Sequence, residues 1–417
     1  MRRGIRILLF LCCFALSGYA ESLKFLVENI KNNPLLNAKI YQKQSLHEEK
    51  KGLYALYLPK VEVGYAYQNT HNPDIFYPAN VNGPFVEATW LLFDGLKREG
   101  KLKAQNDRIK SSEFAIQSTQ QQLILQVIQK YFGALSLQSR KKAVLRQQEE
   151  LQQSIAKYET LYHSGLATQD TLEAIKAQYA QNSYQIENIE LALESYKEQL
   201  SLLSGIENPS LEEYTKIKEI DLQTKPKDRA DLQAQFHYVK SLESVPMQHS
   251  YLPTIALSNR YMHYEYHDRN IPTLPFPFSI DNPKYQNIFG ISISLTLFDT
   301  FATYRAKEAA HLQALAANFE YSYQKDSQRR EQIIAKNALN TAKEKIKWAD
   351  SALTSASIAY AYAKDKFNAQ LIDYTQYLGA LTTFFEAQSF YDESLFEYEI
   401  KKAEFLYNNG ENLEEFL

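Results

Sequence analysis

Residues with metal-binding side chains gather between His263 and Asp268. His263, Glu265 and His267 occupy alternate positions, so they would share one side of an extended segment. Imidazole and carboxylate groups in such an arrangement resemble a zinc site. No second group of His or Cys lies nearby in the sequence. We therefore expect an exposed polar loop margin and assign no metal ligand, although the sequence leaves the metal alternative open.

Sequence motifs of enzyme active sites are absent from the chain. It has no P-loop, no Gly-rich dinucleotide loop, no HExxH motif and no nucleophile elbow. Paired acids are frequent, but they fall on the solvated faces of expected helices. We therefore expect that the protein is not an enzyme and that it binds no cofactor.

The first residues, 1–20, have the pattern of a secretory signal peptide. A basic start is followed by an apolar run over residues 7–15 and a small-x-small cleavage site at residues 18–20. Both cysteines, Cys12 and Cys13, fall inside this segment. We therefore expect a secreted mature chain without cysteine, and hence without disulfide bonds.

Net charge and hydropathy narrow the class of protein further. The 417-residue chain carries a net charge of −3, which argues against nucleic acid as a partner. After the expected signal peptide, the sequence contains no apolar run long enough for a transmembrane helix. Any insertion into lipid must therefore use strands. The sequence pattern of a transmembrane strand is much weaker than that of a transmembrane helix.

The clearest strand pattern lies between Phe289 and Asp299. Apolar residues occupy every second position, among them Ile291, Ile293 and Leu295, and small or polar residues stand between them. Strict alternation places one class of residue on each face of a strand, and about ten residues suffice for a transmembrane strand. We therefore predict that Ile291, Ile293 and Leu295 face lipid.

The chain contains an internal repeat. Phe93-Asp94 and Phe298-Asp299 each end an alternating stretch and open a helix, and they are 205 residues apart (299 − 94). Upstream, Leu58-Pro59 and Leu252-Pro253 are 194 residues apart (252 − 58). A period this long indicates a duplicated half rather than a solenoid unit.

The repeat divides the mature chain into residues 21–227 and residues 228–417. Val86 and Trp90 correspond to Ile291 and Leu295, so we predict that they face lipid too. The predicted strands cover about residues 60–69, 85–93, 254–266 and 288–298. The predicted long helices cover about residues 94–161, 169–203, 300–368 and 374–408. In the third strand the alternation changes at Asn259 and Arg260, and we expect a register shift there.

Four strands cannot close a barrel, and lipid does not tolerate unpaired strand edges. Copies of the chain must therefore join through their strands, and three copies would give twelve strands, enough to enclose a channel. The helices follow directly from the strands, and apolar residues repeat in them at coiled-coil spacing: Ile124, Ile128, Tyr131 and Leu135. We expect a coiled-coil tube that extends the barrel, with the turns at Gly165 and Gln370 at its far tip.

The order of these features resembles the TolC family of outer-membrane efflux channels over essentially all of residues 21–410. The resemblance is carried by Asn33-Pro34, the two Leu-Pro strand starts, the two Phe-Asp junctions, the turn at residues 162–168 and the run Arg229-Ala230-Asp231-Leu232. It implies a mostly α fold with transmembrane β-strands: a homotrimer with a twelve-stranded barrel in outer-membrane lipid and a periplasmic helical tunnel. It also implies two partners, a periplasmic adaptor protein and an inner-membrane pump.

The turns at the tip are where we expect function to concentrate. In family members with acid rings at the tip, the acids stand six and nine residues after the Gly of the second turn. Here these positions are Gln376 and Gly379, so the ring is not carried over. We expect closure to rest on packing and hydrogen bonds around four gate residues: Thr168, Gln370, Asp373 and Gln376. We expect the adaptor to dock on a second group: Tyr162, Gly165, Leu166, Phe367, Leu371 and Ile372.

The predicted function is a passive exit duct of a tripartite efflux or type I secretion system in a Gram-negative bacterium. Asp373 aligns with Thr168 in the repeat, so a helix N-cap is its main expected role, and such a cap also adds charge at the tip. A secreted periplasmic coiled-coil scaffold is the alternative, and it explains the helices but not four alternating strands at matching positions. The sequence does not distinguish drugs, metal ions and proteins as cargo.

Overall fold

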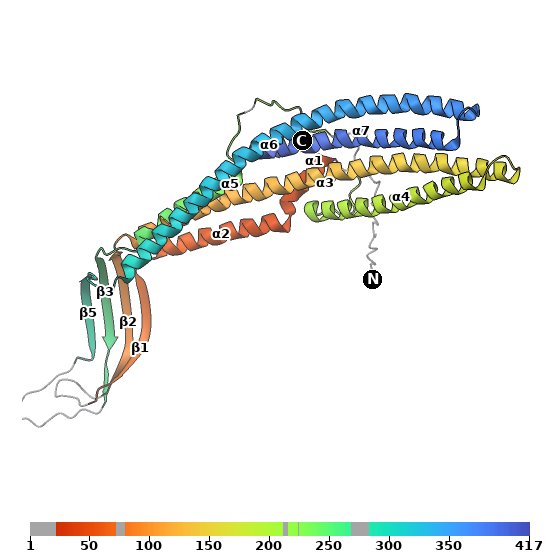
Figure 1. The fold of residues 1–417 in the computed structure, drawn as a ribbon. Coiled ribbons are helices and arrows are strands. Elements are labelled where there is room, and N and C mark those ends of the chain that lie inside the picture. The colour runs from red at the N-terminus through yellow and green to blue at the C-terminus, as the bar shows by residue number, and fades with distance from the viewer. Residues whose placement is uncertain (1–21, 72–79, 212–215, 224, 268–282) are drawn as a thin grey trace, which may run out of the picture. The chain divides into compact units, whose positions relative to one another are not determined.

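The computed structural model describes residues 22–71, 80–211, 216–223, 225–267 and 283–417 (Figure 1). The expected signal peptide lies outside these residues. The chain forms two compact units, which we call the sheet unit (residues 38–117 and 230–327) and the helical unit (residues 1–37, 118–229 and 328–417). Each unit takes segments from both halves of the repeat. Among the described helices, none is both long and apolar enough to cross a membrane.

The sheet unit is built on one antiparallel sheet. Its strands are β1 (Lys60–Asn69), β2 (Asn80–Phe93), β3 (Thr254–His263), β4 (Glu265–His267) and β5 (Tyr285–Ser294). The strand order is β1-β2-β3-β5, and β4 pairs with β2 beyond the end of β3. Since β3 and β4 share one neighbour, the sheet is four strands wide.

The strand register separates an apolar face from a polar face. Trp90 of β2 lies opposite Leu257 of β3, which lies opposite Ile291 of β5, so three large apolar side chains share one face. On the other face Glu87 lies opposite Arg260, with 3.8 Å between carboxylate and guanidinium. The alternation read from the sequence is therefore present in the sheet.

The expected register shift in the third strand is wrong. Pairing between β3 and β5 runs without a break from Thr254 to His263, so no register shift occurs at Asn259 and Arg260. Arg260 fits the unbroken register because Glu87 lies opposite it on the polar face. The irregularity falls instead in β2, between Leu91 and Phe93.

The last strand ends earlier than the pattern predicts. β5 stops at Ser294, whereas alternation continues to Leu297 and the predicted strand to residue 298. Ser294 pairs with Thr254, the first residue of β3, so the residues after Ser294 have no partner strand in the described chain. The side chains of Leu295, Leu297 and Phe298 are exposed.

Helices continue from the strands, as the repeat predicts. α2 (Pro34–Ala55) precedes β1, and α3 (Lys97–His163) follows β2. α5 (Ala230–Glu243) and the 3-10 helix η2 (Val245–Gln248) precede β3, and α6 (Ala302–Asn368) follows β5. α3 and α6 each have 67 residues, which matches the duplication.

The helical unit contains the remaining helices and most of the buried core. These are α1 (Leu23–Asn29), η1 (Ile30–Asn32), α4 (Gln169–Ser204), α7 (Tyr374–Asn408) and η3 (Leu413–Phe416). The α3 positions with coiled-coil spacing are among the most buried residues of the chain: Ile124, Ile128, Tyr131 and Leu135. Their periodicity therefore marks a true packing face.

The Asn33-Pro34 element has a definite structural role. The amide nitrogen Nδ2 of Asn33 donates to the carbonyl oxygens of Leu203, at 3.0 Å, and Leu202, at 3.4 Å. These carbonyls belong to the last turn of α4, where helical partners are missing. Pro34 then begins α2, where its missing N–H costs nothing.

Candidate functional site

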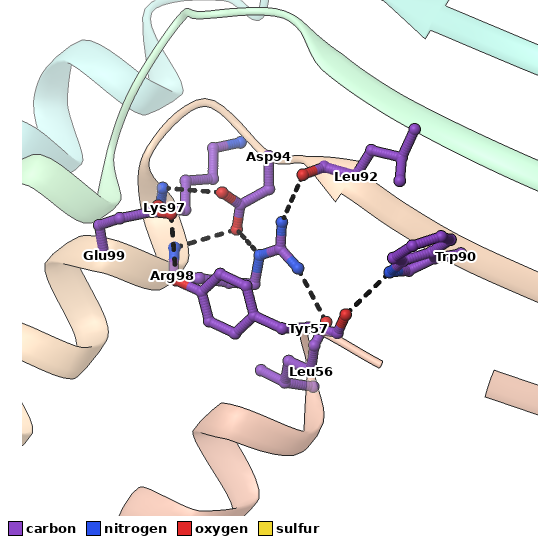
Figure 2. Close-up of polar contacts among 8 residues, drawn as sticks. All are labelled: Leu56, Tyr57, Trp90, Leu92, Asp94, Lys97, Arg98 and Glu99. Carbon is purple, nitrogen blue, oxygen red and sulfur yellow. Dashed lines mark hydrogen bonds and ion pairs between the residues drawn. The ribbon is translucent and has the colours of Figure 1, made fainter. Parts of the chain in front are cut away.

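The first strand-to-helix junction is organised by Asp94. Its carboxylate oxygens accept hydrogen bonds from the backbone N–H groups of Lys97, at 3.1 Å, and Arg98, at 3.0 Å (Figure 2). These are N–H groups of the first helical turn, which have no partner within the helix. The short acid thus ends β2 and starts α3.

Arg98 holds this junction together, and the sequence analysis did not single it out. The residue is only 4% exposed. Nη1 donates to the carbonyl oxygen of Leu56 at 2.8 Å, Nη2 donates to that of Leu92 at 3.2 Å, and Nε lies 3.4 Å from the Asp94 carboxylate (Figure 2). One buried cation therefore joins the end of α2, the end of β2 and the start of α3.

Tyr57 covers the Arg98 guanidinium from the other side. The guanidinium carbon lies 4.2 Å from the centre of the Tyr57 ring, in cation–π geometry. The Tyr57 hydroxyl donates to Glu99 at 3.0 Å, and burial together with that carboxylate raises the pKa of Tyr57. The Tyr57 carbonyl accepts from the indole Nε1 of Trp90 at 2.8 Å, which fixes this predicted lipid-facing residue at the junction (Figure 2).

The second junction repeats the backbone of the first. Gly95 and Leu96 have left-handed φ values of 76° and 68°, and the residues 205 positions later, Thr300 and Phe301, have φ values of 54° and 66°. Asp299 accepts from the N–H of its fourth following residue at 2.8 Å, as Asp94 does. The duplication is thus visible in the dihedral angles, including a conformation that residues other than glycine seldom adopt.

The second junction nevertheless lacks the buried cation. Thr303 stands where the first junction has Arg98. Tyr251, the counterpart of Tyr57, donates its hydroxyl to Asp299 at 3.3 Å and accepts from the N–H of Tyr304 at 3.1 Å. Three apolar side chains around this junction stay exposed in the sheet unit: Leu297, Phe298 and Phe301. Within one copy of the chain, the first junction therefore contains a buried cation, whereas apolar side chains of the second junction remain exposed.

The two predicted tip turns share one hydrogen-bond pattern and lie at the same end of the helical unit (Figure 1). The N–H of Leu166 bonds the carbonyl of Leu161 at 2.8 Å, and the N–H of Leu371 bonds the carbonyl of Lys366 at 2.8 Å. This is the six-to-one bond of a Schellman C-cap. Gly165 has φ 77°, and Gln370 takes the same left-handed position with φ 58°.

The predicted gate residues make local contacts. Asp373 accepts from the N–H of Gln376 at 2.8 Å and caps α7, which is the predicted cap geometry. Thr168 is the N-cap residue of α4, and its hydroxyl lies 3.0 Å from that of Thr171. Within the described residues, no hydrogen bond joins the Thr168 turn to the Gln370–Gln376 turn. Contacts farther from the turns must therefore connect the helix pairs.

A polar network around Glu150 makes this connection, and no local sequence pattern marks it. Glu150 of α3 accepts from Lys364 of α6 at 3.2 Å and from the Tyr377 hydroxyl of α7 at 3.2 Å. Lys364 also donates to the hydroxyl of Tyr360 at 3.4 Å. Partial burial opposes charge on Lys364, but these two hydrogen bonds outweigh it and raise its pKa. Burial raises the pKa of Tyr377, so its hydroxyl remains a donor.

An aromatic cluster surrounds this network and includes two predicted docking residues. The ring of Phe367 stacks on Tyr377, with centroids 4.7 Å apart, and packs near Tyr158 and Tyr374. Ile372 packs against the same cluster. Both residues thus contribute to packing between the helix pairs.

The other docking candidates remain accessible. Leu166 and Leu371 are 77% and 73% exposed, and Tyr162 is exposed as well. A β-carbon added to Gly165 would meet no heavy atom within 4 Å, so this turn borders open space. The predicted docking group therefore divides into partly buried packing residues and exposed turn residues. Leu166 and Leu371 thus place one exposed apolar side chain on each of the two equivalent turns.

The possible metal ligands are not gathered into a site. Within the residues that the structure describes, no group of three His, Cys, Asp or Glu side chains could hold a metal ion. Glu265 accepts a hydrogen bond from Asn82 at 3.3 Å. Asp268, the last member of the candidate group, lies outside the described residues.

Comparison with known families decides the class of protein. Residues 26–206 match the family model described as outer membrane efflux protein. This segment is similar to the outer membrane efflux protein family. The predicted recognition and the outer-membrane localisation are thereby confirmed. The family consists of channel proteins and not of enzymes.

The fold of the chain is that of solved outer-membrane channels. CmeC from Campylobacter jejuni matches with a TM-score of 0.81 and 16% identity, over 93% of this chain and 85% of that chain. VceC from Vibrio cholerae matches with a TM-score of 0.80 and 14% identity, over 94% and 96%. MtrE from Neisseria gonorrhoeae, solved in an open state, matches with a TM-score of 0.76 and 13% identity, over 94% and 89%. At these sequence identities the similarity shows the fold alone. A separate search of curated sequences finds no match.

Proposed function

We propose that the protein is the outer-membrane exit duct of a tripartite efflux or type I secretion system. The observation that carries this proposal is the open sheet. β1 and β5 each have only one neighbouring strand in the described chain, and one face of the sheet carries exposed apolar side chains. A protein of the outer membrane must cover both features, because lipid supplies no hydrogen-bond partners to a strand edge.

Three copies of the chain satisfy this requirement best. Each copy contributes a sheet four strands wide, so two copies give eight strands and three give twelve. An eight-stranded barrel is filled by its own side chains, whereas a larger barrel encloses a water-filled channel. The polar face, with Glu62, Glu87 and Arg260, would then line the water-filled interior. Lipid would contact the face that carries Val86, Trp90, Ile291, Ile293 and Leu295.

The helical unit supplies the docking end in this proposal. Leu166 and Leu371 project from equivalent turns, and a periplasmic adaptor that joins an inner-membrane pump would bind them. The Glu150 network holds the two helix pairs together while the duct is closed. A periplasmic scaffold remains a poor alternative, because it gives no role to an apolar sheet face in an outer membrane protein.

Planar bilayers test the proposal without knowledge of the cargo. We expect the purified protein to form discrete conducting units whose conductance is small in the closed state. Replacement of Glu150 by Gln should increase that conductance, and Glu149→Gln, an exposed neighbour on the same helix, is the matched control. A protein that inserts but never conducts, with or without Glu150, would contradict the duct.

A further inference from the structure

We propose that a groove between α2, α3 and α5 binds the anionic group of the exported cargo. This inference rests on the proposed function, because it requires that these helices form part of the wall of a duct. It names a class of cargo, which the sequence leaves open. The groove lies within the sheet unit and has a volume of about 520 Å³, in the range of sites for drug-sized ligands.

Polar side chains of α2 and α3 form most of the groove. Those on α3 are spaced i, i+3 and i+4, so they share one face of the helix. Those on α2 follow one another at intervals of three residues and also share a face. The six residues are Lys39, Gln42, Ser45, Arg108, Ser111 and Ser112.

The charged groups of the groove are all positive. Lys39 is half-buried and Arg108 is exposed, and neither side chain has a hydrogen bond or an ion pair with any residue that the structure describes. Gln42, Ser45 and Ser112 likewise donate to no described acceptor. Among the described residues that line the groove, none is Asp or Glu. The groove therefore offers hydrogen-bond donors without a carboxylate to accept from them.

Acids on the neighbouring turns have partners of their own. Glu113 of α3 lies 3.0 Å from the ammonium of Lys43 on α2. Glu49 of α2 accepts from the side-chain amide of Gln105 on α3 at 3.1 Å. These contacts hold the acids away from Lys39 and Arg108, so the two cations are left for a ligand.

The contacts of α3 show which side of the three helices carries the groove. Gln105 points toward α2, because its amide donates to the carbonyl oxygen of Leu46 at 2.8 Å. Ser111 points toward α5, because its hydroxyl donates to the carbonyl oxygen of Ala234 at 2.8 Å. Each residue turns an α-helix by about 100°, so Arg108 points midway between these directions, about 60° from each. Seen from α3, the two neighbours are therefore about 120° apart on the side of Arg108.

An angle smaller than a straight line marks the concave side of the three helices. A closed helical tube has its lumen on the concave side of its wall. In the proposed trimer, Lys39 and Arg108 would therefore face the water-filled lumen at three equivalent places. Lys110 is exposed and lies about 160° around α3 from Arg108, so it would face the outside.

The chemistry of the groove selects an organic anion. Ammonium and guanidinium groups bind carboxylate, phosphate or sulfonate groups through charge-assisted hydrogen bonds, and neutral hydroxyl and amide donors add further bonds. A cationic molecule would meet two like charges and no opposite one. Leu46 and Tyr238 add apolar surface beside the donors. The groove therefore fits an anionic group that is attached to an apolar body.

Two probes with the same ring and opposite charge test this assignment. They are naphthalene-1-sulfonate and 1-naphthylmethylammonium. Calorimetry on the purified protein in a nonionic detergent measures binding, and reversible block of the current in planar bilayers measures occupancy of the lumen. We expect the sulfonate to bind and to block at concentrations roughly tenfold or more below those of the ammonium.

Variants of the two cations assign the binding to the groove. Lys39→Gln/Arg108→Gln should weaken binding and block by the sulfonate roughly tenfold or more, and Lys39→Gln/Arg108→Lys should recover part of the loss because it keeps one charge. Lys110→Gln removes a positive charge from the opposite face of the same helix, so it is the matched control and should bind as the unmodified protein does. The native mass in detergent, measured on each variant, shows that assembly is intact.

The possible failures of the inference and of the duct differ. Equal binding of the two probes, or sulfonate binding that survives Lys39→Gln/Arg108→Gln, would overturn the inference and leave the duct intact. Sulfonate binding without block would also overturn it, because the groove would then lie off the conducting path. A protein that never conducts would contradict the duct itself and, with it, the class of cargo.

Discussion

Single residues distinguish the two halves of the repeat. Gly165 and Gln370 occupy equivalent left-handed positions, and Arg98 and Thr303 occupy equivalent positions after the junction acids. Glycine adopts a positive φ without strain, whereas a side chain there costs about 1 kcal/mol or more.

We expect Gly165→Val to abolish efflux while trimers still form. A β-carbon at position 165 has free space, so the variant suffers backbone strain rather than a clash, and the strain would distort the turn that presents Leu166. Gly165→Asn is the control, because Asn tolerates the left-handed conformation. Drug-susceptibility assays beside a trimer blot measure both properties. Full efflux from Gly165→Val with intact trimers would remove this turn from the mechanism.

We expect Arg98→Ala to lower the free energy of unfolding by about 3–5 kcal/mol. The change leaves the carbonyls of Leu56 and Leu92 without their donor and the Asp94 carboxylate without its buried partner. Thr303→Ala, at the equivalent position of the second junction, should cost only about 1 kcal/mol. Urea titration of the two variants measures the difference. Equal losses would show that the first junction does not depend on its cation.

At the scale of elements, the proposal assigns one face of the sheet to lipid and the other to water. Ile293→Arg should destabilise the inserted protein by about 2–4 kcal/mol, because it places a charge in the hydrocarbon region. Ser294→Arg lies one position away on the polar face and should assemble normally. Heat-modifiability of the assembled protein in membranes measures both. Normal assembly of Ile293→Arg together with failure of Ser294→Arg would invert the assigned faces.

The helix pairs are coupled by the Glu150 network. Tyr377→Phe keeps the ring stacked on Phe367 but removes the hydroxyl that donates to Glu150. We expect this variant to increase channel conductance in bilayers, as Glu150→Gln does, and the double variant to add little, because both changes weaken the same network around Glu150. Fully additive effects of the two changes would show that they act on separate contacts.

The sequence predicted elements better than the contacts between them. Helix and strand positions followed from local periodicity, so α7 and β1 begin and end where expected. Local patterns could not reveal that β5 would stop at Ser294, because its length depends on a partner strand. Arg98 and Glu150 were missed for the same reason, since their partners lie on other elements and only the fold brings them together.

For the whole molecule, the central claim is that three copies form one duct. In the described chain the sheet is four strands wide, each edge strand has one neighbour, and one face is apolar and exposed; in an outer membrane these features would require neighbouring copies. In the proposed assembly, contacts between the two halves of one chain would have counterparts between neighbouring chains.

The mass of the purified protein in detergent tests this claim most directly. Light scattering coupled to size-exclusion chromatography, corrected for bound detergent, separates one, two and three chains without ambiguity. The account predicts three chains in each particle, and it predicts that heating in SDS releases monomers. A stable monomer or dimer in mild detergent would contradict the twelve-stranded duct.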